Sequence, residues 1–338
     1  MKQGKNLQEL AVEIKRQQDN KRDFLIPTKE IRTYVHNGEL ELGFPIEKDL
    51  FMGKLTSNGH AQLGQFCDIP KKYYDTMLNH PELLAHNTQH WLTQSNDKRL
   101  VRSLDGNIRA LLSDKYRRLD NYDIAQNILP MLMEAGVDIE SSEITDKKLY
   151  IKAIAKNTQA EITKGDVVSA GLIISNSEIG HGSLSVKPLI YRLICQNGAI
   201  VDDLAMRKYH IGKQNDMMQI EFSNDTVRAE DKAFWLQVRD LVKHTLTETT
   251  FETICNNLRD STTRRIEAPD KAIEMVTKKY SMNEAESGNI LNHLILGGDL
   301  TSWGLGNAVT RMAQDVDSYD RSVELETIGY QIMQNNWN

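Results

Sequence analysis

The sequence predicts an α+β fold: a mainly antiparallel sheet with a crossing helix, followed by a helical C-terminal region. Three observations support this class. Between residues 98 and 200, short apolar alternations are separated by turn signals such as Asp105-Gly106. One amphipathic segment, residues 121–135, interrupts that series and predicts the crossing helix. From about Asn224 onward, apolar residues recur almost throughout at helical spacing.

The composition is that of an ordinary globular protein, with 40% hydrophobic and 26% charged residues in a chain of 338. No apolar run approaches the roughly 18 residues that a membrane span needs, and the polar N-terminus does not resemble a signal peptide. The three cysteines are widely spaced, which predicts neither a disulfide framework nor a zinc knuckle. We therefore expect no membrane contact and a reducing compartment.

The first expected region, residues 1–54, combines a short helix with extended chain. Apolar residues at helical spacing predict the helix over 5–23, and two prolines, two glycines and short alternations predict extended chain over 24–51. The second region, residues 55–223, is expected to be an α+β core that carries a basic hairpin. It opens with helical segments over 60–94, in which prolines stand at favourable helix starts.

The clearest hairpin in the chain pairs residues 99–104 with 107–112 around Asp105-Gly106, because Asp-Gly favours the positive φ angles of a two-residue loop. After the helix at 121–135 come further predicted strands. They span 137–143, 147–156, 166–178 and 183–197. The apolar run 167–174 predicts a central strand that is buried on both faces, and Asn197-Gly198 is interpreted as a closing turn.

The third expected region, residues 224–338, is helical. Four helices are predicted there, near 225–258, 268–281, 283–296 and 302–335, the last broken around 315–319. The glycine-rich stretch before the last helix lacks the Gly-Lys-Ser/Thr of a phosphate loop. Thr301 or Ser302 is better interpreted as an N-cap, with the glycines allowing close helix packing.

The strongest charge feature lies on the hairpin and just after it. Between Lys98 and Arg118 there are seven basic and two acidic residues, a local balance of +5 in a chain of −6. Cations with interleaved aromatic residues are typical of surfaces that bind single-stranded nucleic acid. The candidate nucleic-acid-binding residues are Arg99, Arg102, Arg109, Lys115, Tyr116, Arg117 and Arg118. Arg99 and Arg109 could share a sheet face, where like charges on neighbouring strands repel unless an anion lies between them. The alternative is a solvated strand face paired with acidic helices.

Other polar groups favour weaker hypotheses. Glu178 and His181 stand in a glycine-containing loop and form a possible acid–base pair or anion nest, although a polar hairpin loop is the simpler interpretation. His86 and His90 have the spacing of a zinc helix without its glutamate, so we expect no metal site and no cofactor. The aspartates near Asp315 lack the pattern of a calcium loop.

Several segments resemble the phage- and plasmid-encoded family called domain of unknown function 932. They are residues 69–74, 87–92, 101–102, 108–121, 307–310 and 321–326. The most specific part is the Arg-Ala-Leu-Leu-Ser-Asp-x-Tyr run at 109–116, and the resemblance covers roughly residues 55–330. It implies a protein of mobile elements that works in the cytoplasm of the bacterial host, and it carries over no catalytic residues.

The leading hypothesis is a non-catalytic, oligomeric phage protein that binds single-stranded DNA through this local positive charge. The order of hairpin, helix and strands is similar to that of single-strand annealing proteins, a fold-level analogy that extends the hypothesis to annealing. The six cations of the candidate set would contact phosphate, and Tyr116 would stack on a base. One alternative is a protein-interaction module that modulates a host complex through its acidic helical half. Another is a hydrolase or nuclease that uses His181, Glu178 or the Asp315 cluster.

Overall fold

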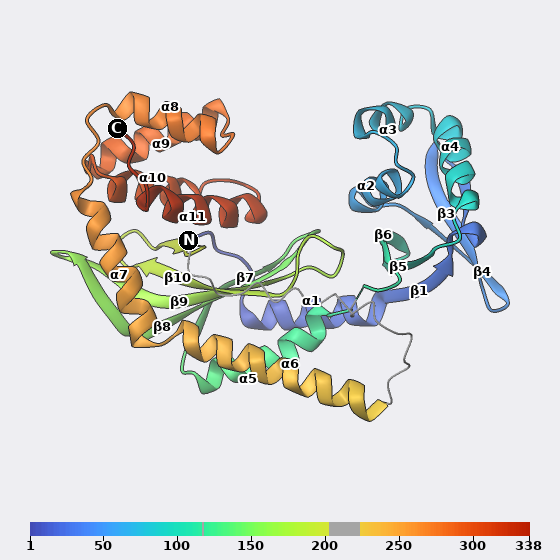
Figure 1. Cartoon of the computed structure of the whole chain (residues 1–338), viewed down its shortest axis with the longest axis horizontal. Coiled ribbons are helices and arrows are strands. Elements are labelled where there is room, and N and C mark those ends of the chain that lie inside the picture. Colours follow the sequence, from blue (N-terminus) through green and yellow to red (C-terminus); the bar gives the residue numbers. More distant parts are fainter. Residues whose placement is uncertain (117, 203–223) are drawn as a thin grey trace.

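Two lobes make up the molecule (Figure 1). The computed structural model describes residues 1–116, 118–202 and 224–338. Residues 21–113 form a smaller lobe, in which two three-stranded antiparallel sheets pack with short helices. The remaining described residues form a larger lobe around a five-stranded antiparallel sheet with helices on both faces. The predicted α+β class, with helices gathered in the C-terminal region, is confirmed.

The smaller lobe alternates strands with short helices. Its strands are β1 (Lys21–Pro27), β2 (Arg32–His36), β3 (Glu39–Ile46), β4 (Asp49–Lys54), β5 (Lys98–Leu104) and β6 (Asn107–Ser113). Its helices are the 3₁₀ turn η1 (Thr28–Glu30), α2 (Ser57–Phe66), α3 (Lys71–Met77) and α4 (Pro81–Gln94). Asp105 and Gly106 take φ angles of 51° and 79°, so the hairpin turn that joins β5 to β6 is confirmed.

The larger lobe is built around the sheet that its central strands form. Its strands are β7 (Asp138–Ile144), β8 (Leu149–Thr163), β9 (Asp166–Asn176), β10 (Ser185–Arg192) and β11 (Asn197–Ile200). Its helices are α1 (Leu7–Asn20), α5 (Asn121–Glu134), α6 (Asn224–Thr245), α7 (Glu248–Thr263), α8 (Pro269–Lys279), α9 (Glu284–Gly297), α10 (Ser302–Met312) and α11 (Tyr319–Met333).

The basic hairpin does not join the sheet of the larger lobe. The described strands form three sheets, in the orders β1-β5-β6, β2-β3-β4 and β11-β10-β9-β8-β7. The prediction of one sheet over residues 98–200 was therefore wrong, because β1 pairs antiparallel with β5 along its whole length and Phe24 stands opposite Val101. The expected region boundary at residue 54 stays a prediction, although this pairing crosses it.

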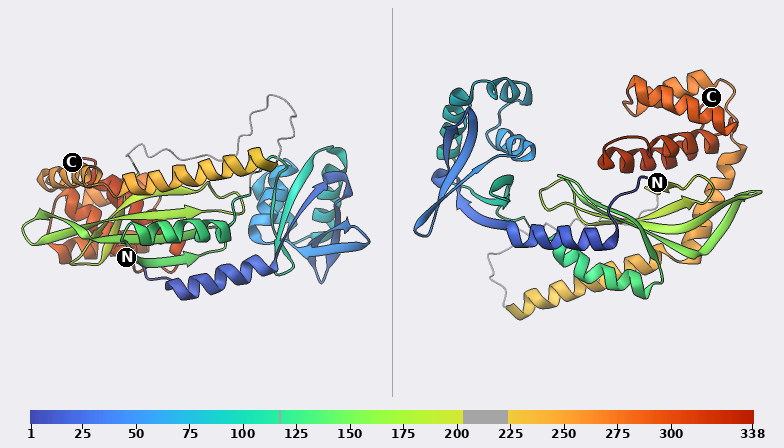
Figure 2. Two further views of the ribbon diagram at one scale, coloured as in Figure 1. Left: turned by 90° about the horizontal axis from the view of Figure 1, so that it is seen from below. Right: turned by 180° about the vertical axis from the view of Figure 1, so that it is seen from behind.

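The five-stranded sheet separates two apolar cores. Strand β9 lies at its centre and is almost wholly buried, as the apolar run predicted. Helices α1, α5 and α6 cover one face, and α7, α10 and α11 cover the other (Figures 1 and 2). Alternation along β8 places Ile151 and Ala153 in the first core, and Tyr150 and Ile154 in the second.

Two boundary predictions were wrong for local reasons. Asn197-Gly198 is not a turn but the start of β11, and the chain reverses just before it, where Gln196 has a φ angle of 52°. The helix expected over 225–258 is two helices, because the Thr247 hydroxyl accepts the Thr250 N–H and starts α7. Thr301 caps α10 as expected, by accepting the Gly304 N–H.

Helices α10 and α11 approach each other closely at two glycines. A Cβ atom built at Gly306 would lie 2.4 Å from Met333 Cγ and 2.6 Å from the Gly329 carbonyl oxygen. We expect Gly306→Ala to lower the free energy of unfolding by about 1–3 kcal/mol, because the backbones must move apart. Urea unfolding followed by circular dichroism measures this loss.

Gly288→Ala is the matched control for that experiment. Gly288 lies inside α9, and a Cβ atom there would meet nothing within 4 Å. Alanine at this position should leave stability unchanged or raise it by about 0.5–1 kcal/mol, since glycine disfavours a helix interior. Equal stability of Gly306→Ala and the wild type would show that α10 and α11 do not need their close approach.

Candidate nucleic-acid interface

Arg102 lies wholly inside the protein. Its side chain has 0% exposure and its Nε and Nη2 atoms donate to the two carboxylate oxygens of Asp23, at 2.9 and 3.0 Å. Nη2 also contacts Asp120, and Nη1 donates to the Glu178 carbonyl oxygen at 2.9 Å. Burial alone would lower the pKa of Arg102, but Asp23 and Asp120 outweigh it and the pKa rises. A phosphate would reach this guanidinium only by displacing these partners.

The anion that pairs with Arg109 is a carboxylate of the same chain. One Glu178 carboxylate oxygen pairs with the Arg109 guanidinium, and the other accepts the Asn121 N–H at 2.7 Å, at the start of α5. Arg109 occupies the β-bulge that shifts the register of β6 against β5. Arg99 instead stands opposite Ser113, with its guanidinium 4.2 Å from the centre of the Phe66 ring. The expected pairing of Arg99 with Arg109 around a bound anion is therefore wrong.

The residues after β6 divide between buried and exposed positions. The Tyr116 hydroxyl donates to the Ser177 carbonyl oxygen at 3.0 Å, and burial raises the pKa of Tyr116. The Tyr116 ring packs against a small apolar cluster that contains Leu112. Lys115 is exposed, and Arg118 has a side chain that is 60% exposed and stands 3.8 Å from Asp23. Arg117 lies outside the described residues.

The loop at 177–182 connects these residues to both lobes. The Ser177 hydroxyl donates to the Lys147 carbonyl oxygen at 2.8 Å and accepts the His181 N–H at 3.0 Å. Side-chain amides of Asn58 and Gln62, both on α2, donate to the Ile179 carbonyl oxygen. Because the Ser177 carbonyl oxygen also accepts from the Tyr116 hydroxyl, Ser177 links Tyr116 to the turn that carries Lys147 and Lys148.

The catalytic interpretation of this loop gains no support from its contacts. Arg109 and the Asn121 N–H occupy the Glu178 carboxylate, and among the described residues no hydrogen bond joins it to His181. The backbone N–H of His181 is satisfied by the Ser177 hydroxyl, so it does not form an open anion nest. The loop holds the lobes together rather than presenting an acid–base pair.

A pocket of about 360 Å³ opens beside the loop, between the five-stranded sheet and α11. The positive side chains that line it are Lys147, Lys148 and Lys187, and His181 lines it as well. Asp320 and Glu324 of α11 also line it, together with apolar side chains, Ile173 of the sheet among them. Sequence reasoning missed this pocket, because its lysines stand far apart along the chain or in a turn.

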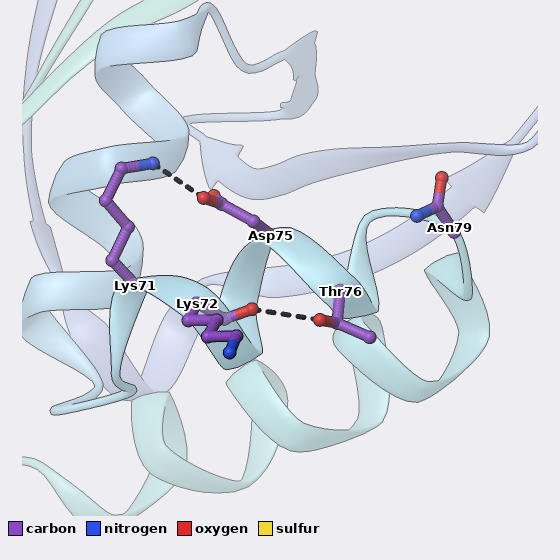
Figure 3. A pocket seen from close by; sticks show the side chains of 5 residues that line it. All are labelled: Lys71, Lys72, Asp75, Thr76 and Asn79. Atoms are coloured by element: carbon purple, nitrogen blue, oxygen red, sulfur yellow. Dashed lines mark hydrogen bonds and ion pairs between the residues drawn. The ribbon is translucent and has the colours of Figure 1, made fainter.

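A second depression, on α3, is wider and shallower (Figure 3). Its lining side chains are Lys71, Lys72, Asp75, Thr76 and Asn79. Lys71 pairs with Asp75 at 2.7 Å, and the Thr76 hydroxyl donates to the Lys72 carbonyl oxygen, so the contacts stay within one short helix. The side chains drawn there do not converge on one point.

The described residues contain no group of three His, Cys, Asp or Glu side chains placed to hold a metal ion. His86 and His90 are both exposed on α4. The aspartates near residue 315 are dispersed: Asp315 pairs with His293 at 2.9 Å, whereas Asp320 accepts from the Tyr150 hydroxyl at 2.8 Å. Among the helices that the structure describes, none is both long and apolar enough to cross a bilayer.

Comparison with known proteins places the chain in one family. The sequence profile of the family described as Domain of unknown function (DUF932) matches residues 110–331, which include the end of the basic hairpin, the 177–182 loop and the pocket. Comparison with curated proteins and with solved structures gives no match. Because the profile covers about two thirds of the sequence, the chain belongs to the family of domain of unknown function 932.

Proposed function

We propose that this protein binds single-stranded DNA through a basic surface centred on Ser177. We call this the Ser177 surface, and define it by the exposed side chains of Lys115, Arg118 and Lys147. The observation that supports it is that Ser177 contacts both Tyr116, which lies between Lys115 and Arg118 in the sequence, and Lys147. Adjacent cations on turns suit the phosphates of a flexible strand.

Two buried arginines, Arg102 and Arg109, support the Ser177 surface by pairing with nearby carboxylates. Arg102 and Arg109 draw Asp23, Asp120 and Glu178 inward, and those carboxylates no longer face a bound strand. Lys21 pairs with Asp120, and Lys147 contacts Ser177, so the carboxylates do not cancel the local excess of positive charge. Tyr116 holds the loop through its hydroxyl rather than offering a free ring.

The shape of the Ser177 surface favours single strands over duplex. Its cations project from turns and a loop, whereas sequence-reading of duplex DNA requires a helix or ribbon that enters the major groove. Single-strand binding needs only a positive track and tolerates an irregular one. A bacterial mobile-element setting, as the family resemblance implies, and assembly into an annealing oligomer are parts of the same proposal.

A fluorescently labelled oligonucleotide tests this proposal directly. Anisotropy titrations at several salt concentrations should show binding that weakens steeply with salt. The double variant Lys115→Ala/Arg118→Ala should bind about tenfold more weakly at low salt. Its slope of log K against log salt should be shallower by roughly 0.7 for each phosphate that the variant no longer binds.

The matched control is Lys71→Ala/Lys72→Ala, which removes two lysines of α3 far from Ser177 in the sequence. It should bind the oligonucleotide as the wild type does. Undetectable binding at about 20 mM salt, or equal losses of affinity in both double variants, would remove the Ser177 surface from consideration.

A protein-interaction module is the second candidate function. It is favoured by the end of α9, where Ile295 and Leu296 are 67% and 83% exposed. Isolated exposed apolar residues are common, but two adjacent ones on a helix end suit a protein contact. Purified protein that carries no nucleic acid, by its absorbance ratio at 260 and 280 nm, and that fails to bind the oligonucleotide would favour this candidate.

A further inference from the structure

The pocket between the sheet and α11 has a positive wall built from three separate elements. Lys147 and Lys148 come from the turn before β8, His181 comes from the loop after β9, and Lys187 comes from β10. The turn and the loop are fixed to each other, because the Ser177 hydroxyl donates to the Lys147 carbonyl oxygen. Four nitrogen-bearing side chains thus line one cavity.

The acidic side chains of the pocket are held by partners within the chain. Asp320 accepts hydrogen bonds from the Tyr150 and Thr145 hydroxyls, at 2.8 and 3.1 Å. Glu324 pairs with Arg321 at 2.7 Å. Both carboxylates therefore have donors other than the lysines of the pocket.

The lysines of the positive wall differ in their partners. Lys187 pairs with Asp202, so an anion at this position would compete with that carboxylate. Lys147 is exposed at the rim and forms no ion pair with any residue that the structure describes. The carboxylates around the pocket therefore do not neutralise all of its cations.

The pKa of His181 depends on the charges that surround it. Partial burial lowers the pKa of His181, and the charges of Lys147 and Lys148 lower it further, against a smaller opposing effect of Asp320. The lysines therefore dominate the field at this end of the pocket. A dianion placed among them would meet attraction from each lysine and a hydrogen-bond donor or acceptor in neutral His181.

We propose that this pocket binds a single nucleotide, with its phosphate among Lys148, Lys187 and His181. The phosphate-binding chemistry follows from the pocket alone, whereas the choice of a nucleotide rests on the proposed function. About 360 Å³ is enough for one nucleotide, and Ile173 and Val323 provide apolar surface for the base or sugar. The carboxylates on α11 suit the hydroxyl groups of a sugar, because a carboxylate accepts from a hydroxyl and repels a phosphate.

The nucleotide has two sources that share this chemistry: a free mononucleotide, or the phosphorylated end of a strand bound at the Ser177 surface. The turn that carries Lys147 belongs to both the surface and the pocket, so a strand can run from one to the other. The experiment therefore compares ligands that differ only in the phosphate or in the strand attached to it.

Isothermal titration of the full chain with thymidine 5′-monophosphate tests the pocket. We expect one site per chain, and at least tenfold weaker binding of thymidine, because a charge-assisted phosphate contact is worth a factor of about ten or more. Lys148→Ala and Lys187→Ala should each weaken monophosphate binding about tenfold. Lys71→Ala is the matched control, as another lysine that lines a depression and pairs with a carboxylate, and should change nothing.

A second arm separates the two sources. If a 5′-phosphorylated oligonucleotide binds more tightly than its 5′-hydroxyl form, and Lys187→Ala abolishes the difference, the pocket holds a strand end. If the two oligonucleotides bind equally while the monophosphate binds, the pocket holds a free nucleotide. Either result supports the site, since both require phosphate binding by these lysines.

The inference is overturned if the monophosphate shows no heat at about 1 mM, or if it binds equally to the wild type and both pocket variants. Its failure is distinguishable from failure of the proposed function. Lys115 and Arg118 do not line the pocket, so loss of oligonucleotide binding in their double variant leaves monophosphate binding intact. Oligonucleotide binding without monophosphate binding removes only the pocket.

Discussion

Lys152→Met should lower the free energy of unfolding by about 3–5 kcal/mol, because it removes one partner of a buried ion pair. Lys152 lies on β8, and its ammonium group contacts both carboxylate oxygens of Glu326 on α11, at 2.9 and 2.6 Å. Both side chains have 0% exposure. Methionine fills nearly the same volume but leaves the Glu326 carboxylate buried without a counter-charge.

The size of this effect follows from burial rather than from the ion pair itself. Burial lowers the pKa of Lys152, and Glu326 opposes that effect. The ammonium also lies 4.9 Å from the centre of the ring of Tyr319, which is the first residue of α11. Loss of Lys152 therefore affects the packing of α11 on the sheet, in addition to the charge balance.

Urea unfolding of three variants separates these contributions. Lys152→Met/Glu326→Leu should recover most of the stability lost in Lys152→Met, because replacing both charges leaves no unpaired group. Lys15→Met is the control, since Lys15 pairs with Asp19 on the surface of α1 and its loss should leave stability almost unchanged. A double variant no more stable than Lys152→Met would contradict the argument.

Local sequence signals predicted those parts of the fold that depend on near neighbours. Asp105-Gly106 predicted the hairpin because its turn needs only two residues with positive φ. The apolar run at 167–174 predicted the central strand β9, and the threonine before the last helices predicted the cap of α10. The break after α6 was missed because Thr247 acts as a cap inside an otherwise continuous helical pattern.

The interior charges could not be predicted from the same signals. Arg102 alternates with apolar residues as an exposed cation would, and its carboxylate partner Asp23 lies 79 residues earlier in the chain. Lys152 has its partner 174 residues later. Because alternation shows which face a side chain takes but not what covers that face, both residues look like surface positions in the sequence.

The candidate site was located in part. The basic hairpin and the glycine-containing loop were each singled out, but their contact through Arg109 and Glu178 depends on how the two lobes pack. The pocket was missed because its positive wall comes from three elements and its acidic wall from α11. Only the Lys147-Lys148 doublet was a local signal, and a doublet in a turn is usually solvated.

Arg102→Met should also destabilise the protein by about 3–5 kcal/mol, and it should do so at the junction of the two lobes. The guanidinium joins Asp23 on β1, Asp120 before α5 and the Glu178 carbonyl oxygen of the loop. Methionine would remove the Arg102 donor from two carboxylates and a carbonyl oxygen, leaving Asp120 with Lys21 and Asp23 with the more distant Arg118. Arg102→Lys keeps the charge but loses the forked geometry, so we expect a smaller loss.

Comparison of Arg102→Met with Arg118→Met decides whether Arg102 stabilises the fold or contacts DNA. Arg118 is 60% exposed and should be replaceable with little loss of stability, while oligonucleotide binding weakens. Arg102→Met should show the reverse: lower stability by urea unfolding, and nearly wild-type affinity for the fraction that remains folded. An Arg102→Met protein of wild-type stability that no longer binds the oligonucleotide would instead make Arg102 a direct phosphate contact, and would mean that its three partners release it when DNA arrives.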